Sequence, residues 1–299
     1  MLKPPRLRAG DMVAIAAPAS PIREEFLSRG VAEIESLGFR CVYEPGILSR
    51  ERYLAGSDRR RADELTRYLN DPQVKAIISA RGGYGSGRAI DLLTVTSLKS
   101  PKILCGYSDI TALHLFFQQR AGWVTFYGPM AAWEFARGDR SYDRAAFMSA
   151  VTGEPQSFSG LRCVRQGPVV RGRTMGGCLS IIEAAAGTGM LPSFEGSILV
   201  LEDESVKPYQ LDRMMVHLRR AEVLTGVRAI VFGEMPHCNQ TEDQGYDLAD
   251  VIADVTPEVP VLTGLAAGHA KRVTTLPLGI EAELDPAAGC MKLLESAVT

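Results

Sequence analysis

The strongest constraint on the fold is a regular alternation of short apolar runs and longer amphipathic segments between residues 12 and 127. Five runs have the length and composition of buried strands, and segments between them carry apolar residues at helical spacing. The expected strands are residues 12–17, 40–43, 74–79, 102–105 and 124–127, and the main expected helices are 22–37, 58–70 and 110–119. This order predicts an α/β fold with a parallel sheet that helices cover on both faces.

The stretch from Lys102 to Ala112 combines a strand, a tight turn and the start of a helix. Ser108 lies at the junction, two residues after Gly106. A serine on such a turn projects its hydroxyl away from the sheet, close to the unpaired N–H groups of the new helix. The pattern is G-x-S-D and lacks the second glycine of a G-x-S-x-G nucleophile elbow. The alternative is that the Ser108 hydroxyl only caps the helix.

The pattern changes between residues 141 and 177, where one expected helix precedes short segments interrupted by Gly and Pro. We interpret this region as a linker. The second half has expected strands at 197–203, 228–233, 260–265, 280–284 and 290–294, and expected helices at 210–221 and 248–255. The prediction is an N-terminal α/β domain at 1–160 that carries Ser108, and a linker with a smaller β-rich domain at 161–299.

Composition and charge limit the class of protein. With 299 residues, 46% hydrophobic residues and a formal net charge of -2, the chain has enough apolar material for a large core. This charge gives no reason to expect nucleic acid or an anionic membrane as a partner. Six scattered cysteines without zinc-type spacing predict a reducing compartment. The apolar run after Asp11 is too short for a signal-peptide core, so we expect a cytoplasmic protein.

The glycine stretch at 82–87 reads Gly-Gly-Tyr-Gly-Ser-Gly. It approximates the G-x-G-x-x-G pattern of dinucleotide sites, but it follows the third expected strand and its spacing does not match well. A second use of such glycines is to bring backbone N–H groups close to a developing oxyanion. A third is a tight turn that needs positive φ. The sequence leaves these uses open.

Two further candidates follow expected strands in the second half. Glu202, Asp203 and Glu204 close the apolar run 198–201, and spacing alone does not select one of them. His269 lies in a Gly-containing loop after the strand at 260–265, whereas His114, His217 and His237 are expected to be structural or surface residues. The order Ser…Glu…His allows a triad in which the histidine accepts the serine proton and the glutamate orients the imidazole.

Several motifs together resemble the LD-carboxypeptidase family, which includes muramoyltetrapeptide carboxypeptidases and microcin C immunity peptidases. They are Arg81-Gly-Gly-Tyr-Gly85, Gly106-Tyr-Ser-Asp-Ile-Thr111, Gly176-Gly-Cys-Leu-Ser180, Leu201-Glu-Asp203, Gly268-His269 and Leu276-Pro-Leu-Gly279. The resemblance implies Ser108 as nucleophile, His269 as general base and Glu202 as its orienting acid. It implies the backbone N–H groups of Gly83 and Asp109 as oxyanion donors. It also implies an amidotransferase-like N-terminal domain, a homodimer, and no metal or organic cofactor.

Two departures from the family pattern affect the expected pocket. Cys178 stands where relatives usually have Asn, and residues 270–273 read Ala-Lys-Arg-Val instead of a Gly-rich, Asn-containing run. The leading hypothesis is hydrolysis of the L,D-amide bond of murein tetrapeptide with release of D-alanine in cell-wall recycling. One alternative is hydrolysis of aminoacyl-nucleotide antibiotics of the microcin C type, for which Trp133 could stack a base. Another is a ligand- or nucleotide-binding protein without catalysis.

Overall fold

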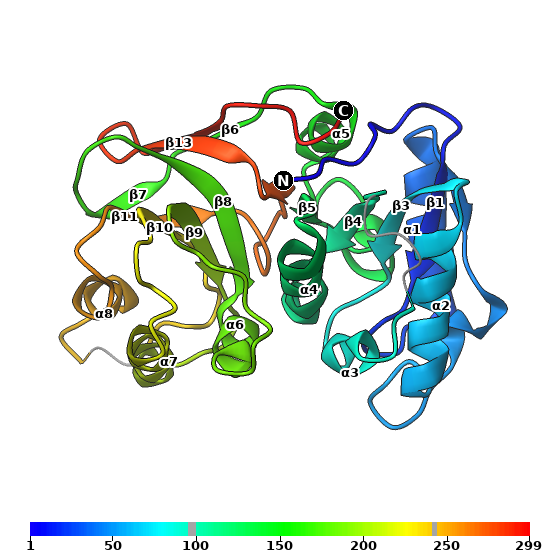
Figure 1. The fold of residues 1–299 in the computed structure, drawn as a ribbon, viewed down its shortest axis with the longest axis horizontal. Coiled ribbons are helices and arrows are strands. Elements are labelled where there is room, and N and C mark those ends of the chain that lie inside the picture. Colours follow the sequence, from blue (N-terminus) through cyan, green and yellow to red (C-terminus); the bar gives the residue numbers. More distant parts are fainter. Residues whose placement is uncertain (95–99, 241–243) are drawn as a thin grey trace.

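The structure is a computed structural model that describes residues 1–94, 100–240 and 244–299. Two β-sheets lie side by side, each accompanied by helices (Figure 1). The prediction of an α/β fold with a parallel N-terminal sheet and a β-rich second half is confirmed. Among the described residues, no helix has the length and apolarity needed to cross a membrane.

The first sheet has six strands in the order β12-β5-β4-β3-β1-β2. Its strands are β1 (Met12–Ala16), β2 (Arg40–Val42), β3 (Val74–Ser79), β4 (Ile103–Gly106), β5 (Thr125–Tyr127) and β12 (Leu276–Leu278). The helices α1 (Glu24–Ser36), α2 (Asp58–Asn70), α3 (Ser86–Ile90) and α4 (Thr111–Ala121) lie between the first five strands in sequence. Those five strands are parallel, so their carboxyl ends meet at one edge of the sheet.

The second sheet has eight strands in the order β6-β14-β13-β8-β9-β10-β11-β7. These are β6 (Ser157–Ser159), β7 (Arg162–Arg165), β8 (Val170–Cys178), β9 (Ser197–Glu202), β10 (Ala229–Gly233), β11 (Val261–Leu265), β13 (Glu281–Asp285) and β14 (Cys290–Leu293). The run from β8 to β11 is parallel and the outer pairs are antiparallel. Four helices belong to this half of the sequence: α5 (Arg144–Thr152), α6 (Leu179–Ala185), α7 (Pro208–Arg220) and α8 (Leu248–Val255).

The prediction of a linker between residues 141 and 177 is wrong. Three strands of the second sheet, β6, β7 and β8, lie within or across this region. The glycines that indicated a linker allow close strand packing instead. A Cβ at Gly176 would collide with the Val200 carbonyl of β9, and one at Gly172 would lie 2.6 Å from the Gly196 carbonyl oxygen. Glycine is therefore required at these positions by the neighbouring backbone.

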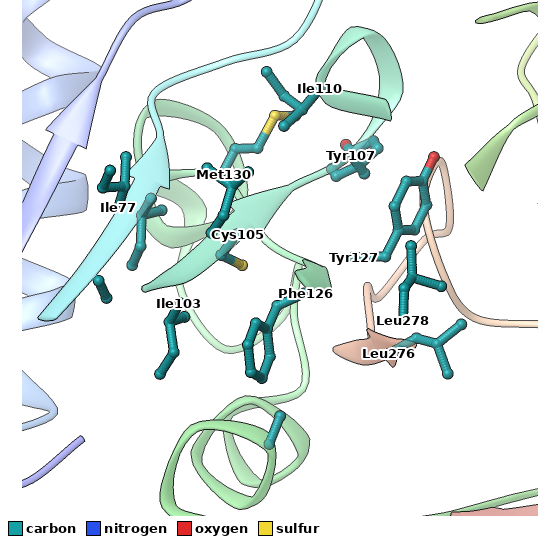
Figure 2. Packing of buried hydrophobic residues seen from close by; sticks show 14 of the residues in the cluster. Ile77, Ile103, Cys105, Tyr107, Ile110, Phe126, Tyr127, Met130, Leu276 and Leu278 are labelled. Carbon is teal, nitrogen blue, oxygen red and sulfur yellow. The ribbon is translucent and has the colours of Figure 1, made fainter. Parts of the chain in front are cut away.

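Strand β12 shows that the two halves of the sequence share the first sheet. It pairs antiparallel with β5, and Leu276 lies opposite Tyr127. Figure 2 shows Leu276 and Leu278 beside Phe126 and Tyr127 in the buried cluster. A segment that follows the His269 loop is thus anchored beside the carboxyl end of β5. The division of the chain between residues 160 and 161 remains a prediction.

Candidate active site

Ser108 occupies the turn between β4 and α4, as the sequence predicts. It has φ 62°, a left-handed conformation that costs a non-glycine residue about 1–2 kcal/mol. A Cβ at Gly106 would lie 3.0 Å from both the Ile110 side chain and Ser79 Oγ, so the turn has no room for a larger residue. The helix-capping alternative is not supported, because neither Ser108–Ile110 nor α4 has a side-chain cap hydrogen bond. Strain of this kind is typical of a nucleophile elbow.

The glycine stretch after β3 packs directly against this turn. A Cβ at Gly82 would lie 2.9 Å from the Ser108 Cβ and 3.2 Å from its Oγ. Gly83 has φ 101° and lies against Ser20, whose hydroxyl accepts a hydrogen bond from the Tyr84 N–H. In the described part of the chain, the N–H groups of Gly83 and Asp109 have no hydrogen-bond acceptor. Both amides are therefore available to an incoming oxyanion.

Glu202 and His269 are in direct contact. His269 donates to Glu202 Oε2 from ring Nδ1 at 2.8 Å and from its backbone N–H at 2.9 Å. Only 1% of the Glu202 side chain and 18% of the His269 side chain are exposed. Gly268, with φ 75°, allows this contact because any side chain there would collide with the Glu202 carboxylate. The hydrogen bond at Nδ1 leaves Nε2 as the ring atom that can accept a proton.

The pKa of His269 is raised above its ordinary value by the surrounding acids. Burial is the largest single influence and disfavours the imidazolium, but the hydrogen bond and negative charge of Glu202 oppose it, followed by the charges of Glu204 and Asp203. The acids outweigh burial, so the net direction is upward. An imidazolium that forms here during a reaction is consequently stabilised.

The three consecutive acids have different environments. Asp203 is 5% exposed and accepts hydrogen bonds from the N–H groups of Ser180 at 2.8 Å and Glu204 at 2.9 Å, so it caps the start of α6. Glu204 has 48% of its side chain exposed, and its Oε2 lies 3.9 Å from His269 Nε2. Among the three, Glu202 alone is buried against the imidazole.

Two tyrosines that the sequence analysis did not select complete this arrangement. The Tyr127 hydroxyl donates to Glu202 Oε1 and accepts from the Ser108 N–H at 3.3 Å, so it connects the acid to the turn. The Tyr107 ring lies edge-on to His269 at 5.1 Å, and its hydroxyl donates to Glu134 Oε1 at 2.7 Å. In the described structure Ser108 Oγ makes no hydrogen bond to His269, and such bonds often tighten only when substrate binds.

An open cleft of about 370 Å³ lies beside Tyr107 and His269. Tyr107 and His269 contribute to its wall, together with ionisable residues from both halves of the chain: Glu134, Arg137, Glu204, Glu234, His237 and Lys271. His237 is exposed, as predicted, but it lines the cleft. By contrast, His114 is fully buried and donates to the Gly106 carbonyl at 2.9 Å, and burial lowers its pKa to about 4.

Cys178 is one of the two departures from the family pattern, and it is the last residue of β8. Its Sγ atom lies 3.7 Å from Asp203 Oδ2. Its backbone N–H donates to Thr111 Oγ1 at 3.0 Å, which joins β8 to the start of α4. Burial, together with the nearby charges of Glu202 and Asp203, raises the pKa of the thiol. It is therefore a neutral packing residue beside the acids.

Comparison with known proteins identifies the family. The LD-carboxypeptidase N-terminal domain matches residues 13–128, and the LD-carboxypeptidase C-terminal domain matches residues 171–284. A putative carboxypeptidase of Streptomyces coelicolor is 36% identical over 98% of this chain and 96% of its own length. The chain belongs to the LD-carboxypeptidase family. It is therefore a peptidase, and the resemblance expected from the motifs is confirmed.

Other relatives have more specific names. A probable murein peptide carboxypeptidase of Bacillus subtilis is 31% identical over 95% of this chain and 92% of its own length. The crystal structure of a muramoyltetrapeptide carboxypeptidase from Oxalobacter formigenes is 30% identical, with a TM-score of 0.86 over 94% of this chain and 97% of that one. The microcin C7 self-immunity protein in complex with aspartyl sulfamoyl adenosine shares the fold, with a TM-score of 0.90 over both full chains at 24% identity.

Proposed function

We propose that this peptidase is a serine-type L,D-carboxypeptidase that releases the terminal D-alanine of murein tetrapeptide. The observation that carries the proposal is the hydrogen-bonded pair of Glu202 and His269, connected through Tyr127 to the strained turn of Ser108. A serine nucleophile needs a base held in one tautomer by an acid, and this pair has that geometry. The murein substrate is taken from the relatives that carry it in their names.

The proposed reaction uses each group in turn. Ser108 Oγ attacks the carbonyl carbon of the L,D-amide while His269 Nε2 accepts its proton. Glu202 stabilises the resulting imidazolium through Nδ1, and the N–H groups of Gly83 and Asp109 bind the oxyanion. His269 then protonates the departing amino group of D-alanine. Water hydrolyses the acyl-enzyme with the same base, which regenerates Ser108.

The test is the release of alanine from murein tetrapeptide by the purified protein, measured by mass spectrometry. We expect D-alanine and the tripeptide as products. A tetrapeptide that differs only in having terminal L-alanine is the control, and it should be cleaved much more slowly. Equal cleavage of both peptides, or of neither, contradicts the proposed specificity.

The aminoacyl-nucleotide alternative receives less support from the cleft. Trp133, the ring considered for stacking a base, already has the Arg137 guanidinium 3.6 Å from its centroid. A base would have to displace that cation or use the other face. Faster hydrolysis of an aminoacyl sulfamoyl adenosine than of the tetrapeptide would favour this alternative over the murein substrate.

The pH dependence of kcat/KM should reflect the raised pKa of His269. The neutral imidazole is the active form, so activity should fall as pH decreases through a value above the ordinary 6.5. A pH–rate profile at constant ionic strength measures this. A profile that is flat between about pH 5 and 8 argues against a histidine base.

Replacing Tyr127 with phenylalanine should lower kcat by about 10-fold and the free energy of unfolding by about 1–3 kcal/mol. The change removes the donor to Glu202 Oε1 and the acceptor of the Ser108 N–H, and the site is fully buried. Tyr142→Phe is a matched control, because that hydroxyl is bonded to Glu33 away from the cleft. It should reduce stability without reducing kcat, and an equal kcat loss in both variants would show that the Tyr127 effect is not local.

The predictions of a homodimer and of a cytoplasmic location remain part of this proposal. Light scattering on the eluting protein gives its mass in solution, and a mass near twice 32.4 kDa is expected for the dimer.

A further inference from the structure

Two arginines converge on one tryptophan beside the candidate active site. Trp133 belongs to the turn of π-helix Ala131–Phe135, and Arg137 follows that turn. The Cζ atom of Arg137 lies 3.6 Å from the Trp133 ring centroid, and that of Arg81 lies 5.2 Å from it. Arg81 comes from a different part of the chain, two residues after the end of β3. Stacking on an indole fixes the plane of a guanidinium and leaves its N–H edge free for a ligand.

Within the described residues, neither guanidinium forms an ion pair. Arg81 makes one weak hydrogen bond, at 3.5 Å to the Pro21 carbonyl, and Arg137 makes none. Two cations held close to one ring repel one another, and an anion bound to both reduces that repulsion. The pair therefore offers two guanidinium groups to an anionic ligand.

In the described structure, the acids of the cleft form hydrogen bonds or close contacts with groups other than these two guanidinium groups. Glu134 accepts hydrogen bonds from the Tyr107 hydroxyl and the Met130 N–H, and burial raises its pKa to about 7, so a fraction is neutral at neutral pH. Glu234 accepts from the Lys271 N–H, while Glu204 faces His269. The charge of Arg137 lowers the pKa of Glu134 against the larger effect of burial, but among the described residues no acid forms an ion pair with Arg81 or Arg137.

This side of the cleft is close to the reacting serine. Arg81 is bonded directly to Gly82, where an added Cβ would lie 2.9 Å from the Ser108 Cβ. Trp133 and Arg137 line the same cleft as His269. In a carboxypeptidase substrate the free carboxylate belongs to the residue immediately after the scissile bond. A group that binds it must therefore lie within one residue's length of the nucleophile.

We infer that Arg81 and Arg137, both stacked on Trp133, bind the C-terminal carboxylate of the peptide substrate. The inference rests on the proposed carboxypeptidase function and adds the residues that select a chain end. Guanidinium groups match a carboxylate in geometry and charge. A peptide bond inside a longer chain offers no carboxylate at this position, so the same two residues exclude internal cleavage.

The test compares murein tetrapeptide with the same peptide carrying a C-terminal carboxamide. The wild-type protein should prefer the carboxylate in kcat/KM. Arg137→Gln and Arg81→Gln should each lower kcat/KM for the carboxylate by about 10- to 100-fold, mainly through KM, and change the carboxamide little. Arg137→Lys, which keeps the charge, should recover part of the preference. Lys271→Gln is the matched control, because Lys271 is an exposed cation of the same cleft outside the Trp133 cluster, and its loss should leave the preference intact.

Binding of both peptides to the Ser108→Ala protein, measured by calorimetry, separates this inference from the proposed function. If the wild-type protein cleaves neither peptide, the function fails, and calorimetry on Ser108→Ala with and without Arg137→Gln still shows whether Arg137 confers a carboxylate preference on binding. Retention of the full preference in both arginine variants overturns the inference. The inference is also overturned if Lys271→Gln abolishes the preference for the carboxylate peptide. It is overturned as well if the arginine variants lose kcat/KM equally for the two peptides.

Discussion

Replacing Ser108 with alanine should reduce D-alanine release by at least about 1,000-fold. The triad groups act as one unit, so the loss of the nucleophile leaves only what the oxyanion donors and substrate binding contribute. The alanine keeps the left-handed backbone, with φ near 62°, and the same contact with Gly82. The fold and the free energy of unfolding should change little. Turnover and thermal unfolding of the same preparation measure both effects.

Ser108→Gly provides a sharper version of this experiment. Glycine adopts positive φ without the steric cost that serine carries here, so this variant should be as inactive as Ser108→Ala and more stable than the wild-type protein by about 1 kcal/mol. A gain in stability with complete loss of activity would show that the strained backbone at residue 108 is kept because it positions the serine hydroxyl. If folded Ser108→Ala keeps most of its activity, the nucleophile has been assigned wrongly.

Local sequence patterns were sufficient to predict the bounds of an element that is buried and continuous. The bounds of β3 (Val74–Ser79) and α8 (Leu248–Val255) agree with the prediction to the residue. In β3 five of six residues are buried, and α8 has an Asp247 capping box at its start. The pattern failed at β8, because its glycines indicate a linker unless the close approach of β9 is known. It also failed at β12, whose three residues are stabilised by pairing with distant β5.

The candidate site likewise contains residues that the sequence predicted and residues that it did not. Ser108 and His269 each follow a strand and Glu202 ends β9, so topology places them at the carboxyl ends of strands, and the family motifs select them. Tyr127 could have been considered on the same ground, because it is the last residue of β5. Its partner Glu202, however, is 75 residues away, and no spacing in the sequence predicts that bond. The Arg81–Trp133–Arg137 cluster likewise depends on packing between separate elements.

Glu202→Gln should reduce turnover by at least about 100-fold, as expected when an amide replaces the acid that orients a catalytic histidine. Glutamine has one oxygen for the three donors that Glu202 now satisfies, namely the Tyr127 hydroxyl and the Nδ1–H and backbone N–H of His269. It also removes the charge that stabilises the imidazolium. Because Glu202 raises the pKa of His269, the acid limb of the pH–rate profile should move to lower pH in this variant.

The two neighbouring acids are the controls for this variant. Asp203→Asn keeps an oxygen for the Ser180 N–H at the start of α6, so it should lower stability modestly and affect turnover much less. Glu204 is half exposed and 3.9 Å from Nε2, where water screens its charge, so Glu204→Gln should also have a small effect. Steady-state kinetics on the three single variants rank the three acids by their contribution to turnover. A larger loss of turnover in Glu204→Gln than in Glu202→Gln would reverse the assignment, because it would place the functional carboxylate at the solvent side of the imidazole.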